Sequence, residues 1–239
     1  MSIKSTLRPI VWQSRAIGRY LKRKLDLTPP PPVSREPAFD PETRAWFMER
    51  IGSVRAYVEY GAGASSLLAS DAGVPTISIE SDAAYAKAVQ DALSQGKRDI
   101  PSDSSVINEV RVADIGTTED WGSPLWIVPV ARHAERWKAY PEAGPKAIAA
   151  LGRFPDLVLV DGRFRVACCL AMIRAAIRES AETQILFDDY VLREQYAGVE
   201  DVLGTPELIG RAALFTIQPA TLNKADIDRA YERTLSDYR

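Results

Sequence analysis

The sequence predicts an α/β fold in which a mostly parallel sheet is covered by helices on both faces. Short apolar segments alternate with longer segments of helical periodicity, and several of the apolar segments end in an acidic residue or a glycine. Alternation of this kind is typical of parallel sheets, because each pair of parallel strands needs a crossover connection. With 239 residues, 46% of them hydrophobic, the chain can build one large domain around its own core.

The elements follow one another along the chain with recognisable boundaries. Asp40-Pro41 predicts the start of a helix, with Asp as N-cap and Pro at the first helical position, and Gly52 can end it. We expect strands at 54–60, 75–80, 106–113, 156–161 and 184–188, and a final pair near 206–218. We expect further helices at 64–72, 82–95, 165–179 and 224–236.

The stretch 115–153 interrupts this alternation, and we interpret it as a long insertion. Insertions of this length in a compact domain are more often functional than accidental. It contains Trp121, Trp126, Trp137 and Tyr140. Trp121, Trp137 and Tyr140 are candidates to line a pocket for a sugar or an aromatic ring, or to anchor the insertion.

Residues 1–35 are predicted to form an N-terminal extension separate from the domain at 36–239. Apolar residues spaced three and four apart indicate an amphipathic helix, and Pro29 to Pro32 form a stiff linker. Residues 1–28 carry seven basic residues against Asp26, a net charge of +6, so the remaining chain must carry −8 to give the total of −2. The basic helix is expected to pack on the body or a partner subunit, or to lie on an anionic membrane surface as a peripheral contact.

The composition excludes several other classes of protein. An acidic body argues against nucleic acid as a partner. No run approaches the about 18 apolar residues of a membrane span, and the N-terminus lacks a signal-peptide core, so we expect a cytoplasmic protein. Cys168 and Cys169 are adjacent and are the only cysteines, which excludes a disulfide framework or a zinc cluster.

A glycine-containing turn after the first strand is the most informative motif. Glu59, Gly61 and Gly63 lie between the strand and a predicted helix, where glycines let a ligand approach the backbone. A dinucleotide site would need a third glycine where this chain has Ser66, and Glu59 would repel a pyrophosphate. A ligand with a cationic amino-acid end fits Glu59 better, and Glu80, at the end of the next strand, can accept hydrogen bonds from ribose hydroxyls.

The three runs E-Y-G-A-G-A-S, I-S-I-E-S-D and V-A-D together resemble the first half of class I S-adenosylmethionine-dependent methyltransferases, over about residues 54–218. The resemblance implies a Rossmann-like methyltransferase fold with a seven-stranded sheet and S-adenosyl-L-methionine as cofactor. It implies that Glu59 and the loop of Gly61, Gly63 and Ser65 hold the methionine part, while Glu80 binds the ribose diol. Asp114, at the end of the third strand, would lie near the adenine.

Three aspartates are predicted to meet at the same edge of the sheet. Asp161 follows the fourth strand, Asp188 and Asp189 follow the fifth, and neighbouring strands lie about 4.8 Å apart. Mg²⁺ would relieve the repulsion among these carboxylates. The arrangement is similar to metal-dependent small-molecule and sugar O-methyltransferases, which implies that the three aspartates are ligands and that the metal activates the acceptor hydroxyl. Alternatively, Arg163 or Arg165 neutralises the carboxylates, or the two arginines recognise an anionic substrate.

The expected reaction is methylation of a hydroxyl on a small molecule or glycan, with Asp161 and His133 as catalytic candidates. His133 is the only histidine and could act as a general base, and Tyr190 is a second candidate for proton transfer. A noncatalytic protein that keeps the fold, acting as a partner or docking on a membrane, is the alternative. An NAD-dependent oxidoreductase is disfavoured by Glu59 and Ser66.

Overall fold

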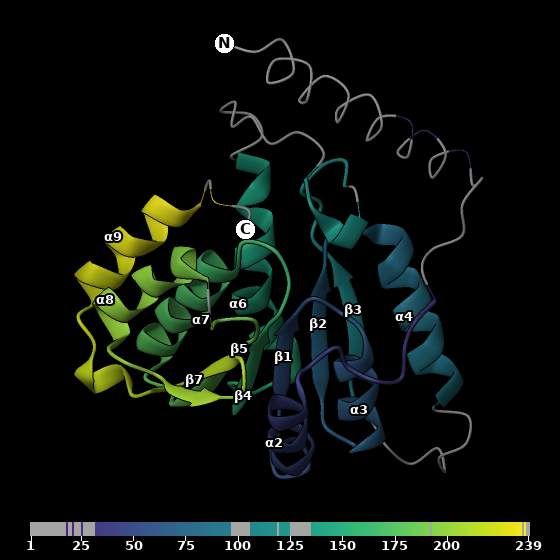
Figure 1. Ribbon diagram of the computed structural model, residues 1–239, viewed down its shortest axis with the longest axis horizontal. Helices are drawn as coiled ribbons and strands as arrows, with labels where there is room; N and C mark the ends of the chain where they lie inside the picture. Colours follow the sequence, from purple (N-terminus) through teal and green to yellow (C-terminus); the bar gives the residue numbers. More distant parts are fainter. Residues whose placement is uncertain are drawn as a thin grey trace.

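The computed structural model describes residues 18, 21, 25, 32–96, 106–118, 120–124, 135–191, 193–235 and 237. Within these residues, seven strands form one sheet in the order β3-β2-β1-β4-β5-β7-β6, and helices lie against both faces (Figure 1). The strands are β1 (Tyr57–Tyr60), β2 (Thr76–Glu80), β3 (Asn108–Val112), β4 (Leu157–Val160), β5 (Thr183–Phe187), β6 (Glu207–Ile209) and β7 (Ala212–Ile217). The α helices are α2 (Pro41–Ile51), α3 (Ala64–Asp71), α4 (Ala83–Gly96), α6 (Ala139–Leu151), α7 (Arg165–Glu179), α8 (Glu200–Leu203) and α9 (Lys224–Thr234). Short 3-10 helices are η2 (Asp120–Gly122), η3 (Glu194–Val199) and η4 (Pro219–Thr221).

The pairing of the strands confirms the predicted mixed α/β fold with a mostly parallel sheet. β3, β2, β1, β4 and β5 are parallel to one another, whereas β7 runs antiparallel to both β5 and β6. The direction in which the chain adds strands reverses between β1 and β4. In open α/β sheets, ligands bind beyond the carboxyl ends of the strands at such a reversal.

Alternating residues of β1 face the two sides of the sheet. Val58 and Tyr60 belong to the apolar core under α6, α7 and α9, whereas Tyr57 packs with residues of α2 and α3 on the opposite face. Glu59 shares the side of Tyr57, because side chains alternate along a strand. The sheet therefore places this carboxylate under α3, the helix that follows the glycine turn.

The N-terminus of α2 confirms the capping prediction. Asp40 Oδ1 accepts hydrogen bonds from the N–H groups of Glu42 (3.1 Å) and Thr43 (3.2 Å), and Pro41 is the first helical residue. The β6–β7 turn lies beside this cap, since Asp40 Oδ2 accepts the N–H of Arg211 at 3.0 Å. The cap thus also connects the start of the domain to the antiparallel end of the sheet.

Part of the predicted insertion at 115–153 is α6, the helix of the β3–β4 crossover, and that part of the prediction is wrong. Pro141, Gly144 and Pro145 within α6 conceal its helical pattern. Gly144 is required there, because a Cβ at this position would overlap the hydroxyl of Tyr60.

The aromatic residues of the same stretch do not line one pocket. Trp137 and Tyr140 are buried in the core, with ring centroids 5.7 and 6.0 Å from that of Phe164. Trp121 is 87% exposed. Trp126 lies outside the described residues.

The predicted amphipathic helix over residues 1–28 and the Pro29–Pro32 linker lie almost entirely outside the described residues. Within the part that the structure covers, no helix combines the length and apolarity needed to cross a membrane.

Candidate cofactor and active site

The glycine turn after β1 is packed against the turn after β4. Gly61 has a φ of +95°, and a Cβ there would lie 3.0 Å from the carbonyl carbon of Asp161 and 3.0 Å from the nitrogen of Gly162. Both the backbone conformation and the close approach therefore require glycine at position 61. Gly63 is the N-cap residue of α3, and only the hydroxyl of Tyr85 lies within 4 Å of its Cβ position. The backbone of the turn is left open to a ligand on this side.

Glu59 lies under the turn, fully buried, within a cage of hydroxyl groups. Its Oε2 accepts hydrogen bonds from Tyr57 Oη (2.9 Å) and Ser65 Oγ (2.5 Å), and its Oε1 accepts from Ser78 Oγ (2.5 Å) and Ser66 Oγ. Burial raises the pKa of Glu59, and the four hydroxyls oppose that shift. An ionised carboxylate has about four acceptor sites, so four donors match the charged form. No described basic residue forms an ion pair with it.

This cage explains why Ser66 replaces the glycine of a dinucleotide motif. The Ser66 hydroxyl donates to Glu59 and accepts the N–H of Gly63 at 3.0 Å, so it also fixes the turn. Ser66 and Ser78 are site residues that the sequence reasoning missed. Ser78 carried a signal, because a polar residue in the middle of a buried apolar strand needs a hydrogen-bond partner.

Glu80 is buried at the end of β2 with one oxygen available. Oε1 accepts hydrogen bonds from the N–H groups of Ser81 (2.6 Å) and Asp82 (2.9 Å), and Ser81 Oγ lies 3.2 Å from it. No hydrogen bond from the described residues ends on Oε2. A carboxylate fixed through one oxygen and open at the other suits the hydroxyls of a ribose.

Asp114 follows β3 and lies on the surface. It forms an ion pair with Arg136 and accepts the N–H of Gly116 at 2.9 Å, and the hydrogen bond from Arg136 lowers its pKa. The structure thus brings Glu59, Glu80 and the glycine turn to one edge of the sheet, with Asp114 following the strand next to β2.

A solved structure has the same fold with related sequence. It is a methyltransferase-like protein from Silicibacter pomeroyi DSS-3, with a TM-score of 0.69 and 30% sequence identity, and the match covers 84% of this chain and 97% of that chain. This chain belongs to the methyltransferase-like family. No protein-family model and no curated protein matches it.

The fold of a methyltransferase-like protein suggests S-adenosyl-L-methionine as ligand, and the residues around the turn fit this molecule. Gly61 and Gly63 leave the backbone accessible, and Oε2 of Glu80 is open to a diol. Glu59 adds negative charge beneath the turn, although its oxygens are taken up by hydroxyls. It supports the turn from below through Ser65 and Ser66.

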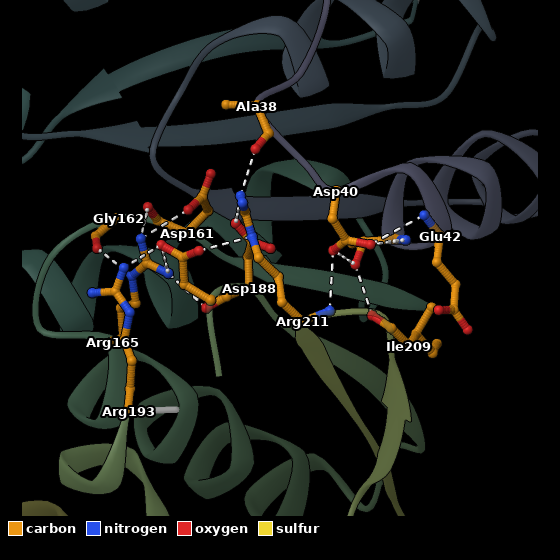
Figure 2. A network of polar contacts seen from close by, with 12 residues as sticks. Ala38, Asp40, Glu42, Asp161, Gly162, Arg165, Asp188, Arg193, Ile209 and Arg211 are labelled. Atoms are coloured by element: carbon orange, nitrogen blue, oxygen red, sulfur yellow. Dashed lines mark hydrogen bonds and ion pairs between the residues drawn. The ribbon is translucent and has the colours of Figure 1, made fainter. Parts of the chain in front are cut away.

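Arginines surround the aspartates that follow β4 and β5, and Figure 2 shows Asp161 and Asp188 among them. Arg165, largely buried, donates to the carbonyl oxygens of Gly162 (3.0 Å), Asp188 (2.6 Å) and Asp161 (3.0 Å). It also donates to Asp161 Oδ1 at 2.9 Å. One guanidinium therefore joins the ends of two neighbouring strands and neutralises a carboxylate.

Two further arginines pair with the aspartates that follow β5. Arg211 Nε lies 2.8 Å from Asp189 Oδ1, and Arg211 Nη2 lies 3.5 Å from Asp188 Oδ2. Arg193 Nη2 lies 2.5 Å from Asp189 Oδ2. Asp188 is buried, and its Oδ1 has no hydrogen-bond partner among the described residues. The cluster thus balances three carboxylates with three guanidinium groups.

The described residues do not fit the predicted Mg²⁺ site of Asp161, Asp188 and Asp189. No group of three or more His, Cys, Asp or Glu residues in the described ranges is placed to hold a metal ion. The physical reason is that arginine side chains already lie around the carboxylates and supply the positive charge that a metal ion would otherwise bring. Of the two arginines named as alternatives, Arg165 fills this role, whereas Arg163 Nε donates to the carbonyl oxygen of Trp121 at 2.9 Å.

The pKa of Asp161 is raised, first by burial and then by the neighbouring carboxylates of Asp188 and Asp189, while Arg165 opposes the shift. Its side chain is still 34% exposed. Tyr190 donates its hydroxyl to Glu200 at 2.8 Å and is committed to that contact.

His133 lies outside the described residues. Arg193 and Arg211 were missed by the sequence reasoning. No local pattern marks Arg211, because its partners are 22 or more positions away in the sequence.

Proposed function

We propose that this protein is an S-adenosylmethionine-dependent methyltransferase that methylates an oxygen of a small molecule or glycan. The observation that supports it is the buried carboxyl group of Glu59 directly beneath a glycine turn, which accepts hydrogen bonds from four neutral hydroxyls and forms no ion pair with a described arginine. Four donors match the ionised form of a carboxylate. A buried carboxylate that keeps its charge attracts a cation. The methionine end of this cofactor carries both a sulfonium and an ammonium.

The cofactor supplies an activated methyl group, so the protein mainly has to position the two reactants. Glu80 would hold the ribose through Oε2, and the turn at Gly61 and Gly63 would receive the methionine part. Asp161 would accept the proton of the hydroxyl that is methylated. Its side chain is partly exposed, and its backbone touches the turn at Gly61.

Calorimetric titration of S-adenosylmethionine and S-adenosylhomocysteine tests the proposal. The wild type should bind both at micromolar strength, and Glu80→Ala should weaken binding about tenfold to a hundredfold, the cost of a hydrogen bond to a charged group. Glu207→Ala, an exposed carboxylate on the edge strand β6, is the matched control and should bind like the wild type.

Absence of binding to either molecule would overturn the proposal. If binding is observed, release of S-adenosylhomocysteine with panels of hydroxylated acceptors separates an enzyme from the noncatalytic alternative.

A further inference from the structure

We infer that Arg163 binds a carboxylate of the ligand held at the glycine turn; this inference rests on the proposed function. Two molecules could supply the carboxylate: the methionine end of the cofactor or an acidic acceptor. The cofactor is favoured by position, and the experiment below distinguishes the two.

Arg163 differs from the other arginines at this edge of the sheet. Arg165, Arg193 and Arg211 each pair with an aspartate, whereas Arg163 forms no ion pair with any residue that the structure describes. Its one side-chain hydrogen bond within these residues runs from Nε to Trp121 O at 2.9 Å. The Nη1 and Nη2 donors, the pair that binds carboxylates in a bidentate manner, are left for a ligand.

The backbone fixes Arg163 at the rim of the glycine turn. The preceding residue, Gly162, has its nitrogen 3.0 Å from the Cβ position of Gly61. The following residue, Phe164, is fully buried and packs with Trp137 and Tyr140. Arg163 therefore extends from a rigid turn next to the site at which the methionine part is expected.

The segment at Trp121 and Gly122 lies across the edge of the sheet at which the glycine turn lies. Ser81 Oγ donates to Gly122 O at 3.0 Å, and a Cβ on Gly122 would lie 3.2 Å from Glu80 Oε1. The segment thus touches the end of β2 at Ser81 and the end of β4 at Arg163. Because β1 lies between β2 and β4, the glycine turn lies between the two contacts.

This placement matches the two ends of the proposed ligand. A ribose at Glu80 and a carboxylate at Arg163 would be the two ends of a molecule that extends along the turn. The electrostatics agree, because burial and the neighbouring Arg165 lower the pKa of Arg163, so an anion beside it would be stabilising.

Two ligands that differ in the amino-acid part provide the test. S-adenosylhomocysteine carries the carboxylate, and 5′-methylthioadenosine lacks it. Arg163→Gln should weaken S-adenosylhomocysteine about tenfold to a hundredfold and leave 5′-methylthioadenosine unchanged. Arg163→Lys, which keeps the charge but loses the paired donors, should fall between, and it replaces Arg163→Gln if that variant fails to fold.

Arg193→Gln is the matched control, because Arg193 already pairs with Asp189, and it should bind both ligands like the wild type. If Arg163→Gln binds S-adenosylhomocysteine normally, glucuronate is titrated into the protein saturated with S-adenosylhomocysteine. Binding to the wild type that is lost in Arg163→Gln assigns the carboxylate to the acceptor, and no binding overturns the inference. Failure of the wild type to bind either nucleoside instead overturns the proposed function, and this inference with it.

Discussion

Glu59 and the aspartates at 161, 188 and 189 lie at the same edge of the sheet, yet their charges are stabilised in different ways. Hydroxyl groups surround Glu59, whereas guanidinium groups surround the aspartates. Hydroxyls donate hydrogen bonds to the oxygens of a carboxylate but leave its charge in place. Guanidinium groups donate hydrogen bonds and also neutralise the charge. We therefore expect an ionised Glu59 to give the glycine turn a negative potential that suits a cationic cofactor, whereas the aspartate cluster is balanced and should attract a metal ion only weakly.

The largest expected effect comes from removing the charge balance of the aspartate cluster. Arg165→Ala leaves Asp161 without its ion pair and three carbonyl oxygens without a donor. Loss of one partner of a buried ion pair costs about 3–5 kcal/mol of unfolding free energy, which urea denaturation measures.

Arg193→Ala is the control for this prediction. It removes a side chain that is 43% exposed and should cost about 1 kcal/mol or less. Equal costs for the two variants would contradict the view that Arg165 is the main support of the cluster.

A smaller effect is expected on the glycine-turn side. Glu59→Gln keeps the shape of the side chain but replaces an acceptor oxygen by a donor, which then faces hydroxyls such as that of Ser65. One or more buried hydroxyls would lose a partner, at a cost of about 1–3 kcal/mol of unfolding free energy. Affinity for S-adenosylhomocysteine should fall as well, because the negative charge beneath the turn is lost.

Glu207→Gln, at an exposed position, should stay within about 0.5 kcal/mol of the wild type. A Glu59→Gln protein with wild-type stability would show that Glu59 is already protonated and that the comparison of the two clusters is mistaken.

Much of the site around the glycine turn could be predicted from the sequence, because its residues are close together along the chain. Glu59, Gly61 and Gly63 form one local motif, and Glu80 ends the next strand. The succession of strands along the chain and the capping of α2 by Asp40 were also predictable from local patterns.

The aspartate cluster was only half predictable. Strand ends placed Asp161 and Asp188 correctly, but Arg211 reaches them from the β6–β7 turn, and only the folded chain brings these segments together. In the sequence, the aspartates appear without their arginine partners and therefore suggest a metal site. The folded structure brings the arginines to them. α6 was missed for a different reason. Gly144 is required by its close approach to Tyr60 of β1, and Pro145 disfavours a helix interior, so neither residue indicates a helix in the sequence.

Asp40 is a carboxylate in a third kind of environment, in which most hydrogen-bond donors are backbone amides. Acid titration compares it with Glu59 and the aspartate cluster. Burial alone would raise its pKa, but hydrogen bonds from the Thr43 hydroxyl and the N–H groups of Arg211, Thr43 and Glu42 lower it from 3.8 to about 2. Because the folded-state pKa is depressed, the stabilisation is present above the usual pKa of 3.8 and is lost as the pH falls through about 2.

The variant Asp40→Asn should remove this part of the acid sensitivity, measured as melting temperature against pH. Asp40→Ala, which also removes the cap, should cost about 1 kcal/mol near neutral pH. An acid profile of Asp40→Asn that coincides with the wild type would assign the sensitivity to other carboxylates.

The smallest expected effect is that of divalent cations, because the wild-type aspartate cluster already has its positive charges. A cation that binds only the folded protein at a hundred times its Kd adds about 2.7 kcal/mol of stability. In a chain of this size, that would raise the melting temperature by about 5–10 °C. Mg²⁺, Mn²⁺ and EDTA should instead leave the wild-type melting temperature unchanged within about 1 °C. Arg211→Ala removes the ion-pair partner of Asp188 and one of the partners of Asp189, so this variant should gain a cation-dependent rise that the wild type lacks. A rise in the wild type equal to that of Arg211→Ala would mean that a metal ion binds the aspartates despite the arginines. The arginines would then not distinguish the aspartate cluster from a metal site.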